Sequence, residues 1–206
     1  MYMRSFDLFK SYIENLEVKD VEELMILVGE GSYYDVENII TLLNSNNIKF
    51  FGGVYSRLLV SDKCETKGFI VQKYEPIYSA TIIPHMMRFK LAKEAYENST
   101  AIILVDGLSV NIKDLTDTVF DRLGNAVKYI GGGAGFYDLK QRPCIFDNNG
   151  LSKDTLHICI VKSDINIRVE HGWNILEGPF IVTKSRDNTL IKLDNYAAFD
   201  VYKDII

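Results

Sequence analysis

The sequence predicts a mixed α/β fold, in which duplicated β-α-β-β units form one or more mixed sheets with flanking helices. Two observations predict this fold. First, an apolar run, a helical pattern and a second apolar run that enters consecutive glycines follow one another in the same order twice along the 206 residues. Second, shorter strand-like segments follow each glycine run, and strands that alternate with helices are typical of α/β proteins.

The first copy of the unit begins with an apolar run at residues 24–28. Apolar residues spaced three or four positions apart between 36 and 43 predict a helix with one buried face. A strand then enters Gly52-Gly53, and the segments GFIVQKY (68–74) and IYSATII (77–83) predict two further strands. Together these elements make a β-α-β-β unit.

The second copy has the same order of elements. A strand at 102–105 precedes apolar residues with helical spacing between 112 and 123, and a further strand leads into the glycines that begin at Gly131. The segments RPCIFDNNG (142–150) and TLHICIVKS (155–163) predict the closing strands, with a hairpin turn at Asp147-Asn148-Asn149-Gly150. Equivalent positions of the two copies lie at nearly constant separation, which favours an internal repeat.

Elements outside the repeat complete the predicted architecture. They are an amphipathic N-terminal helix (6–16), a connecting helix behind Pro84 (about 86–97), a strand NIRVEHGW (166–173), a hairpin FIVTKSRDNTLIKLD (180–194) and a short helix from Ala197. No proline-rich or charged linker interrupts the chain. We therefore expect one domain, residues 1–206, built from two similar halves, about 22–83 and 100–170, plus a C-terminal hairpin and helix at 171–206.

Composition and charge restrict the classes of partner. The chain is 47% hydrophobic and 25% charged, as in ordinary soluble domains, and its net charge of −5 disfavours binding to nucleic acid or anionic lipid. Its longest apolar runs, such as AIILV (101–105), are far shorter than the roughly 20 residues of a membrane span, and its first residues lack the apolar centre of a signal peptide. We expect a cytoplasmic location, with neither a nucleic-acid nor a membrane partner.

The cysteines predict reduced thiols, because Cys64, Cys144 and Cys159 are odd in number and widely spaced. Neither the cysteines nor the three histidines show the C-x-x-C or H-x-x-x-H spacing of a zinc site. We expect no bound metal and no cofactor.

The run YIGGGAGFYD (129–138) raises the question of a phosphate site. A dinucleotide fingerprint requires glycines at its first, third and sixth positions and then a helix, but the sixth position from Gly131 is Phe136 and a strand-like run follows. No P-loop motif occurs either. Two interpretations remain: the glycines let the backbone kink or approach another strand, or exposed N–H groups of a loop, Gly132, Gly133, Ala134 and Gly135, bind a carboxylate or another small anion.

Two further features are candidates for ligand contact. Asp106 ends the second-copy strand, where α/β proteins often bind ligands, and its carboxylate would either bind an ammonium group or cap the following helix. His171 and Trp173, in the sequence HGW, supply a titratable ring and a broad apolar face, which suit a ligand pocket. The alternative is a bulge in which Trp173 fills the core and His171 bonds to the backbone.

Catalysis has little support in the sequence. No G-x-S-x-G motif occurs, and only three histidines could act as a base. A small thiol-dependent α/β enzyme that uses Cys144 and His171 is an alternative, but the apolar surroundings of Cys144 favour an inert buried thiol. We expect no enzymatic activity.

The ordered succession YIGGGAG, HGW, VTK and then LD with AAFDVY resembles the N-terminal half of the FIST domain. The resemblance covers residue 24 to the end, and its specific part is 131–202. Two positions depart from the family pattern: Asp138 follows the glycines later than usual, and Asn195 stands where glycine is common. FIST domains are sensory modules of intracellular signalling proteins, so the resemblance implies an input module that binds a small ligand, with amino acids as the favoured suggestion.

The resemblance also implies partners. FIST domains are joined to signalling output domains such as histidine kinases and diguanylate cyclases, and they usually continue into a C-terminal FIST half, which we expect to be absent from this chain. Our hypothesis is a cytoplasmic sensory domain that binds a small polar ligand and regulates a signalling partner or output domain. The alternatives are a protein-interaction scaffold without a ligand and the thiol enzyme. The expected ligand-binding residues are Gly132, Gly133, Ala134, Gly135, Asp138, His171, Trp173 and Asp106.

Overall fold

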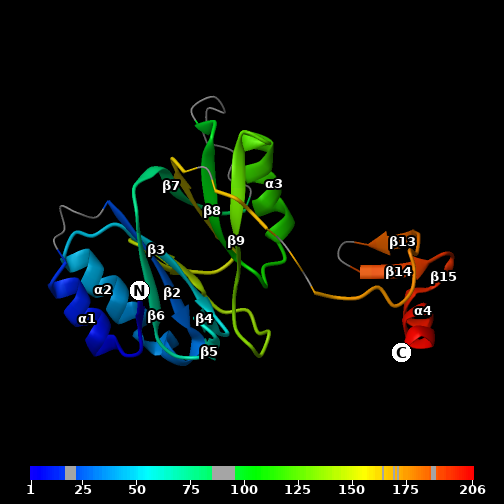
Figure 1. Cartoon of the computed structure of the whole chain (residues 1–206), viewed down its shortest axis with the longest axis horizontal. Coiled ribbons are helices and arrows are strands. Elements are labelled where there is room, and N and C mark those ends of the chain that lie inside the picture. Colours follow the sequence, from blue (N-terminus) through cyan, green and yellow to red (C-terminus); the bar gives the residue numbers. More distant parts are fainter. Residues whose placement is uncertain (17–21, 85–95, 164, 169, 171, 187–188) are drawn as a thin grey trace. The chain divides into compact units, whose positions relative to one another are not determined.

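The computed structural model describes residues 1–16, 22–84, 96–163, 165–168, 170, 172–186 and 189–206 (Figure 1). The chain divides into two compact units, Met1–Asn166 and Ile167–Ile206. The first unit contains β1 (Tyr2–Met3), α1 (Phe6–Glu14), β2 (Glu23–Gly29), the 3-10 helix η2 (Glu30–Asp35), α2 (Val36–Ser45), β3 (Phe50–Tyr55), β4 (Leu58–Val60), β5 (Lys63–Glu65), β6 (Phe69–Tyr74), β7 (Pro76–Ile82), β8 (Ser99–Asp106), α3 (Ile112–Leu123), β9 (Val127–Ala134), β10 (Ile145–Asp147), β11 (Gly150–Ser152) and β12 (Leu156–Val161).

Two mixed sheets organise the first unit. The first sheet has the strand order β1-β6-β2-β3-β10-β11, and the second has the order β7-β12-β8-β9. Each sheet contains one parallel pair joined by a helix: α2 connects β2 to β3, and α3 connects β8 to β9. All their other neighbouring strands are antiparallel. The predicted α/β class, with mixed sheets and flanking helices, is therefore confirmed, whereas the origin of the two sheets by duplication stays a prediction.

Helices cover the outer face of the first sheet, where Figure 1 shows α1 and α2. Leu24, Ile26 and Val28 alternate along β2 and are fully buried, as expected for the apolar face of a strand. The ring of Phe9 on α1 lies 5.5 Å from the ring of Phe69 on β6. This contact fixes the N-terminal helix against the sheet.

The central strands of the second sheet, β8 and β12, are buried on both faces, because their residues alternate between two cores. Val105 and Ile158 pack in one core with Leu115 of α3. Ile102 and Leu104, which point the other way, belong to the larger core that the first sheet builds. The first unit is therefore layered as helices, sheet, sheet and helix, and the faces of the two sheets pack against each other.

A buried polar cluster also joins the two sheets. His157 of β12 lies between two hydroxyls of β7, with Ser79 Oγ 2.9 Å from Nε2 and Thr81 Oγ1 2.8 Å from Nδ1. Ser79 Oγ lies 2.9 Å from Oε1 of Glu23 on β2, and Thr81 Oγ1 lies 2.5 Å from Oδ2 of Asp147 on β10. The imidazole also stacks on Phe51 of β3, with ring centroids 4.3 Å apart. These contacts hold the sheets in one lateral position.

The second unit contains β13 (Val182–Arg186), β14 (Thr189–Leu193), β15 (Tyr196–Ala197) and α4 (Ala198–Ile205). The three strands form an antiparallel meander, which confirms the predicted hairpin and the short C-terminal helix. The predicted strand at 166–173 is wrong at its described residues, because they are exposed and pair with no neighbouring strand.

The remaining predicted elements are confirmed with shifts at their ends, and the turn at Asp147–Gly150 is a hairpin between β10 and β11. The connecting helix predicted near 86–97 falls mostly on 85–95, outside the described residues. None of the helices in the described ranges is long and apolar enough to cross a membrane.

Acid should destabilise the first unit through His157. Burial lowers the pKa of this imidazole to about 4, below its ordinary value of 6.5. The unfolded chain therefore takes up the proton first, so stability from the neutral imidazole is fully present above pH 6.5 and is lost as the pH falls towards 4. We expect the contribution of His157 to fall by about 3 kcal/mol over this window, seen as the difference between the wild type and a variant without the imidazole.

Urea unfolding of the wild-type chain and of His157→Gln between pH 7.5 and 4.5 measures this effect. We expect the variant to be less stable at pH 7.5 but to lose less stability on acidification. Parallel curves for the two chains would contradict this account of His157.

Candidate functional site

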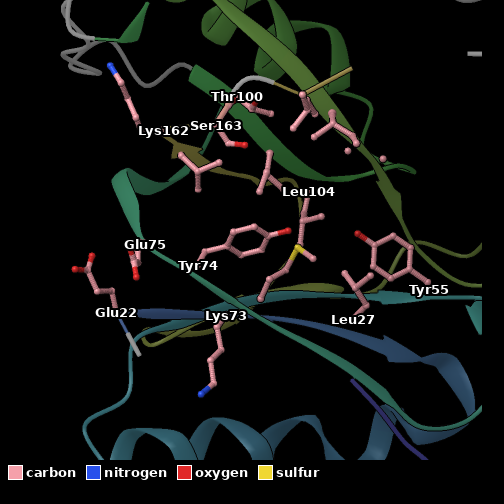
Figure 2. Close-up of a pocket in the computed structure, with 17 residues that line it drawn as sticks. Glu22, Leu27, Tyr55, Lys73, Tyr74, Glu75, Thr100, Leu104, Lys162 and Ser163 are labelled. Carbon is pink, nitrogen blue, oxygen red and sulfur yellow. Dashed lines mark hydrogen bonds between the residues drawn. The ribbon is translucent and has the colours of Figure 1, made fainter. Parts of the chain in front are cut away.

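A cavity of about 860 Å³ lies between the two sheets, and Figure 2 shows side chains that reach into it from both. Its walls come from β2, β3 and β6 of the first sheet and from β8, β9 and β12 of the second. The polar cluster around His157 lies on the other side of the sandwich, towards β7 and β10. The sheets are thus joined on one side and leave a hollow on the other.

Most of the cavity wall is apolar. Met25, Leu27 and Tyr74 line it from the first sheet, and Ile102 and Leu104 line it from the second. Gly131 and Gly132 of β9 also line it, and because Gly132 has no side chain it leaves this part of the space unfilled. Such a wall suits the apolar part of a small organic ligand.

The charged side chains at the rim of the cavity are two acids, Glu22 and Glu75, and two bases, Lys73 and Lys162. Figure 2 shows the carboxylates of Glu22 and Glu75 at one end, whereas the side chains of Lys73 and Lys162 extend away from the space between the sheets. The hydroxyl of Thr100 also lines the cavity, where it donates a hydrogen bond of 2.6 Å to a backbone carbonyl. A cationic group therefore suits this end of the cavity better than an anion.

Two tyrosines add neutral hydroxyls to the lining. Burial raises the pKa of Tyr55 and of Tyr74, and the neighbouring thiols Cys144 and Cys159 raise it further. Both phenols therefore stay protonated at neutral pH and are able to donate or accept a hydrogen bond.

The predicted glycine loop is instead part of strand β9, which continues to Ala134. Gly131 has φ +153°, and a Cβ there would lie 1.8 Å from the carbonyl oxygen of Ile103. A Cβ on Gly133 would lie 3.0 Å from the Cα of Gly107. At Gly132, by contrast, a Cβ would meet no atom within 4 Å. Close approach of neighbouring backbones thus explains why glycine is required at 131 and 133. Among the predicted site residues of this run, Gly132 lines the cavity.

Three neighbouring site predictions lie away from the cavity. Ala134 is buried, and the N–H of Gly135 donates a 2.8 Å hydrogen bond to the carbonyl of Val54, so it is not exposed for a ligand. Asp138 accepts hydrogen bonds from the backbone N–H of Lys140 and from the guanidinium of Arg142. Ligand contact by these residues stays a prediction.

Asp106 is 1% exposed, and its carboxylate is surrounded by donors of the protein itself. Oδ1 accepts a hydrogen bond from the N–H of Leu108, and Oδ2 accepts hydrogen bonds from the N–H of Asp154 and from Nε2 of Gln141. These bonds hold the loops that follow β8 and β11. The binding of an ammonium group by Asp106 remains a prediction.

The two candidate residues of the HGW segment, His171 and Trp173, have different outcomes. His171 lies outside the described residues. Trp173 belongs to the second unit and is 81% exposed, so the alternative that it fills the core is wrong.

The environment of Cys144 disfavours the thiol-enzyme alternative. The residue is fully buried, and burial together with the Asp106 carboxylate raises the pKa of the thiol. A nucleophilic cysteine requires a lowered pKa, so that the thiolate is present at neutral pH. Within the described ranges, no three side chains of histidine, cysteine, aspartate or glutamate gather closely enough to hold a metal ion.

Comparison with known families assigns the chain to a family. A sequence model of the FIST N domain matches residues 59–196, about two thirds of the chain. The matched range contains the second-sheet wall of the cavity and the segment 73–75, but not Met25 or Leu27. No curated protein and no solved structure matches the chain.

Neighbouring glycines of β9 should differ sharply in their tolerance of a side chain. Gly131→Ala would drive its Cβ into the Ile103 carbonyl, and we expect it to destabilise the first unit by at least about 2 kcal/mol. Gly132→Ala is the matched control, and we expect a change within about 1 kcal/mol. Urea denaturation midpoints measure both. Equal effects of the two substitutions would show that close approach to β8 is not what requires Gly131.

Proposed function

Since the chain belongs to the FIST N domain family, whose members are signal-transduction sensory domains, we propose that it senses a small polar ligand that carries an ammonium group and an apolar part. An amino acid has this combination of groups. The single observation that carries the proposal is the cavity between the sheets, which combines an apolar wall with two carboxylates, Glu22 and Glu75, at one end of its rim.

The size of the cavity supports a small organic molecule. Its volume of about 860 Å³ is within the range of known ligand pockets, roughly 300–1,000 Å³. This volume is larger than a single ion needs. Because both sheets contribute to the wall, a bound molecule would contact both at once.

Charge supports an ammonium group on the ligand. We expect Glu22 and Glu75 to attract it, with the phenols of Tyr55 and Tyr74 as further hydrogen-bonding partners. The apolar part would contact Met25 and the neighbouring aliphatic side chains of the wall. No covalent step is required, so this function needs neither a nucleophile nor a cofactor.

Signalling would follow from a change in how the sheets pack. A ligand that contacts both sheets favours the sheet spacing that it fits best, and it shifts the population towards that state in proportion to its difference in affinity. The output would be a signalling domain or a C-terminal FIST half that binds one state better than the other.

One observation favours a protein-interaction role in addition. Large apolar side chains of the second unit are exposed, and exposed apolar side chains that gather in one patch would form an interaction site. The most exposed of them are Trp173, Ile175, Leu176, Phe199 and Ile206. This surface fits a protein partner that receives the signal, as well as the scaffold alternative.

Ligand binding is expected to require the ammonium group. In a thermal-shift screen, apolar amino acids should raise the Tm of the full chain by about 5 °C at a concentration of about 100 times Kd. The N-acetylated forms of the same amino acids lack the positive charge and should bind at least about tenfold more weakly. Equal binding of the two forms would contradict the proposed role of Glu22 and Glu75.

Substitutions of the cavity provide the second test. Gly132→Phe should block the space and abolish binding, whereas Gly132→Ala should retain most of it, because a Cβ at this position meets no other atom. The double variant Glu22→Gln with Glu75→Gln should weaken binding about tenfold, and Glu37→Gln, on the surface of α2, is the control. Isothermal titration calorimetry on folded variants would contradict the proposal if Gly132→Phe bound as the wild type does.

A further inference from the structure

The polar cluster between the sheets is a continuous chain of hydrogen bonds. It runs from Glu23 through Ser79, His157 and Thr81 to Asp147, and its four links measure 2.9, 2.9, 2.8 and 2.5 Å. Glu23 and His157 are only 5% and 3% exposed. Each link is therefore formed between protein atoms in a largely dry space.

The ordinary protonation states of these groups supply too few protons for the chain. Each hydroxyl has one proton, a neutral imidazole has one N–H, and an ionised carboxylate has none. That gives three protons for four links. Without a fourth proton, two acceptors would face each other within 2.9 Å in an environment where such repulsion is strong. The geometry thus requires one additional proton.

His157 and Asp147 are poor places for this proton. The imidazole stacks flat on Phe51 and is buried, which disfavours the imidazolium, and burial lowers its pKa. Asp147 is only half-buried, and its Oδ1 also accepts a 2.7 Å hydrogen bond from the N–H of Asn149. Asp147 thus accepts hydrogen bonds from both the Thr81 hydroxyl and the Asn149 N–H, an arrangement that suits an ionised carboxylate.

Glu23 has the opposite surroundings. Its Oε2 is buried and has no hydrogen-bond partner among the described residues. An ionised oxygen without a donor is costly in a dry interior, whereas a neutral carboxyl group is not. Burial is also the main cause that raises the pKa of Glu23.

We propose that Glu23 is a neutral carboxylic acid at pH 7, that its O–H donates to Ser79 and completes the chain between the sheets, and that loss of this proton at higher pH loosens their packing. The first unit then contains a switch that responds to alkaline pH. Because Glu23 lies between Glu22 and Met25 on β2, the loosening would reach the wall of the cavity.

Other titratable and charged groups also surround Glu23. Ser79 of β7 hydrogen-bonds to it, and Ser79, the nearby Cys159 thiol of β12 and Lys49, which precedes β3, lower its pKa, whereas Asp147 of β10 raises it. Lys49 is exposed, so solvent screens its charge. Cys159 stays a neutral thiol, because burial and Glu23 raise its pKa. Tyr74, the β6 neighbour of Glu23 in the sheet, also stays neutral.

The sign of the pH dependence follows from this. A folded carboxyl group that keeps its proton above the ordinary glutamate pKa of 4.5 contributes stability that is fully present below pH 4.5. This stability is lost as the pH rises through the raised pKa of Glu23. Over that window, the unfolding constant should rise by up to about tenfold per pH unit relative to a chain without the carboxyl group.

Infrared spectroscopy of the full chain at pH 7 tests the assignment directly. A protonated carboxylic acid has a carbonyl stretch that ionised carboxylates lack. We expect this band in the wild type, its loss in Glu23→Gln and its persistence in the control Glu37→Gln. The amide of Glu23→Gln is able to donate to Ser79, so this variant should fold, and its unfolding constant should rise less with pH than that of the wild type.

Two measurements on the wild-type chain keep the test decisive even if the variant is unstable. Carbon-13 labelling of glutamate side chains should shift the band, and nitrogen-15 NMR should report a neutral His157 ring at pH 7. The proposal is overturned if the protonated-acid band is absent at pH 7, if it does not respond to glutamate labelling, or if His157 is an imidazolium.

Discussion

The packing of two mixed sheets face to face is the constraint on which the rest of the first unit depends. Each sheet has one face covered by helices and one face turned towards the other sheet. Apolar side chains and the His157 cluster fill the space between the sheets towards β7 and β10, and they leave the cavity towards β6 and β9. The packed side, at β7 and β10, fixes the position of the two sheets. The cavity on the opposite side leaves room for a ligand that could change how the sheets pack. The same arrangement therefore serves both stability and the proposed sensing.

Glycine makes this arrangement possible at the level of the backbone. Gly131 lies so close to Ile103 that no side chain fits, and Gly52 approaches Ile26 with a similar lack of room. Gly132, next in the chain, has open space and lines the cavity. One short run thus brings two parallel strands together and keeps the space beside them empty. Phosphate binding is not needed to explain it.

Local patterns in the sequence predicted much of the fold. Helical spacing identified α2 and α3, and the turn signal identified the hairpin turn at Asp147–Gly150, because these signals depend on neighbouring residues. The strand after this turn was wrong, because β11 pairs with β10, whereas the predicted strand at 155–163 is β12, which pairs with β7 and β8. The cavity could not be predicted, since Met25 and Leu104 have the pattern of ordinary core positions and meet only through the packing of two sheets. His157 likewise sits in an apolar strand, and its partners lie about 76 to 78 residues earlier in the chain. The predicted strand at 166–173 failed because alternation alone does not supply a neighbouring strand.

The central claim, that a small ligand with an ammonium group binds between the sheets, is tested most directly by NMR of methionine methyl groups. The chain has five methionines, and Met25 lines the cavity whereas Met3 is buried in the core. Titration with an apolar amino acid should shift the Met25 methyl resonance, leave that of Met3 in place, and give ligand-to-methyl Overhauser effects at Met25. A ligand that binds while the Met25 resonance stays unchanged would place the site elsewhere and contradict the account.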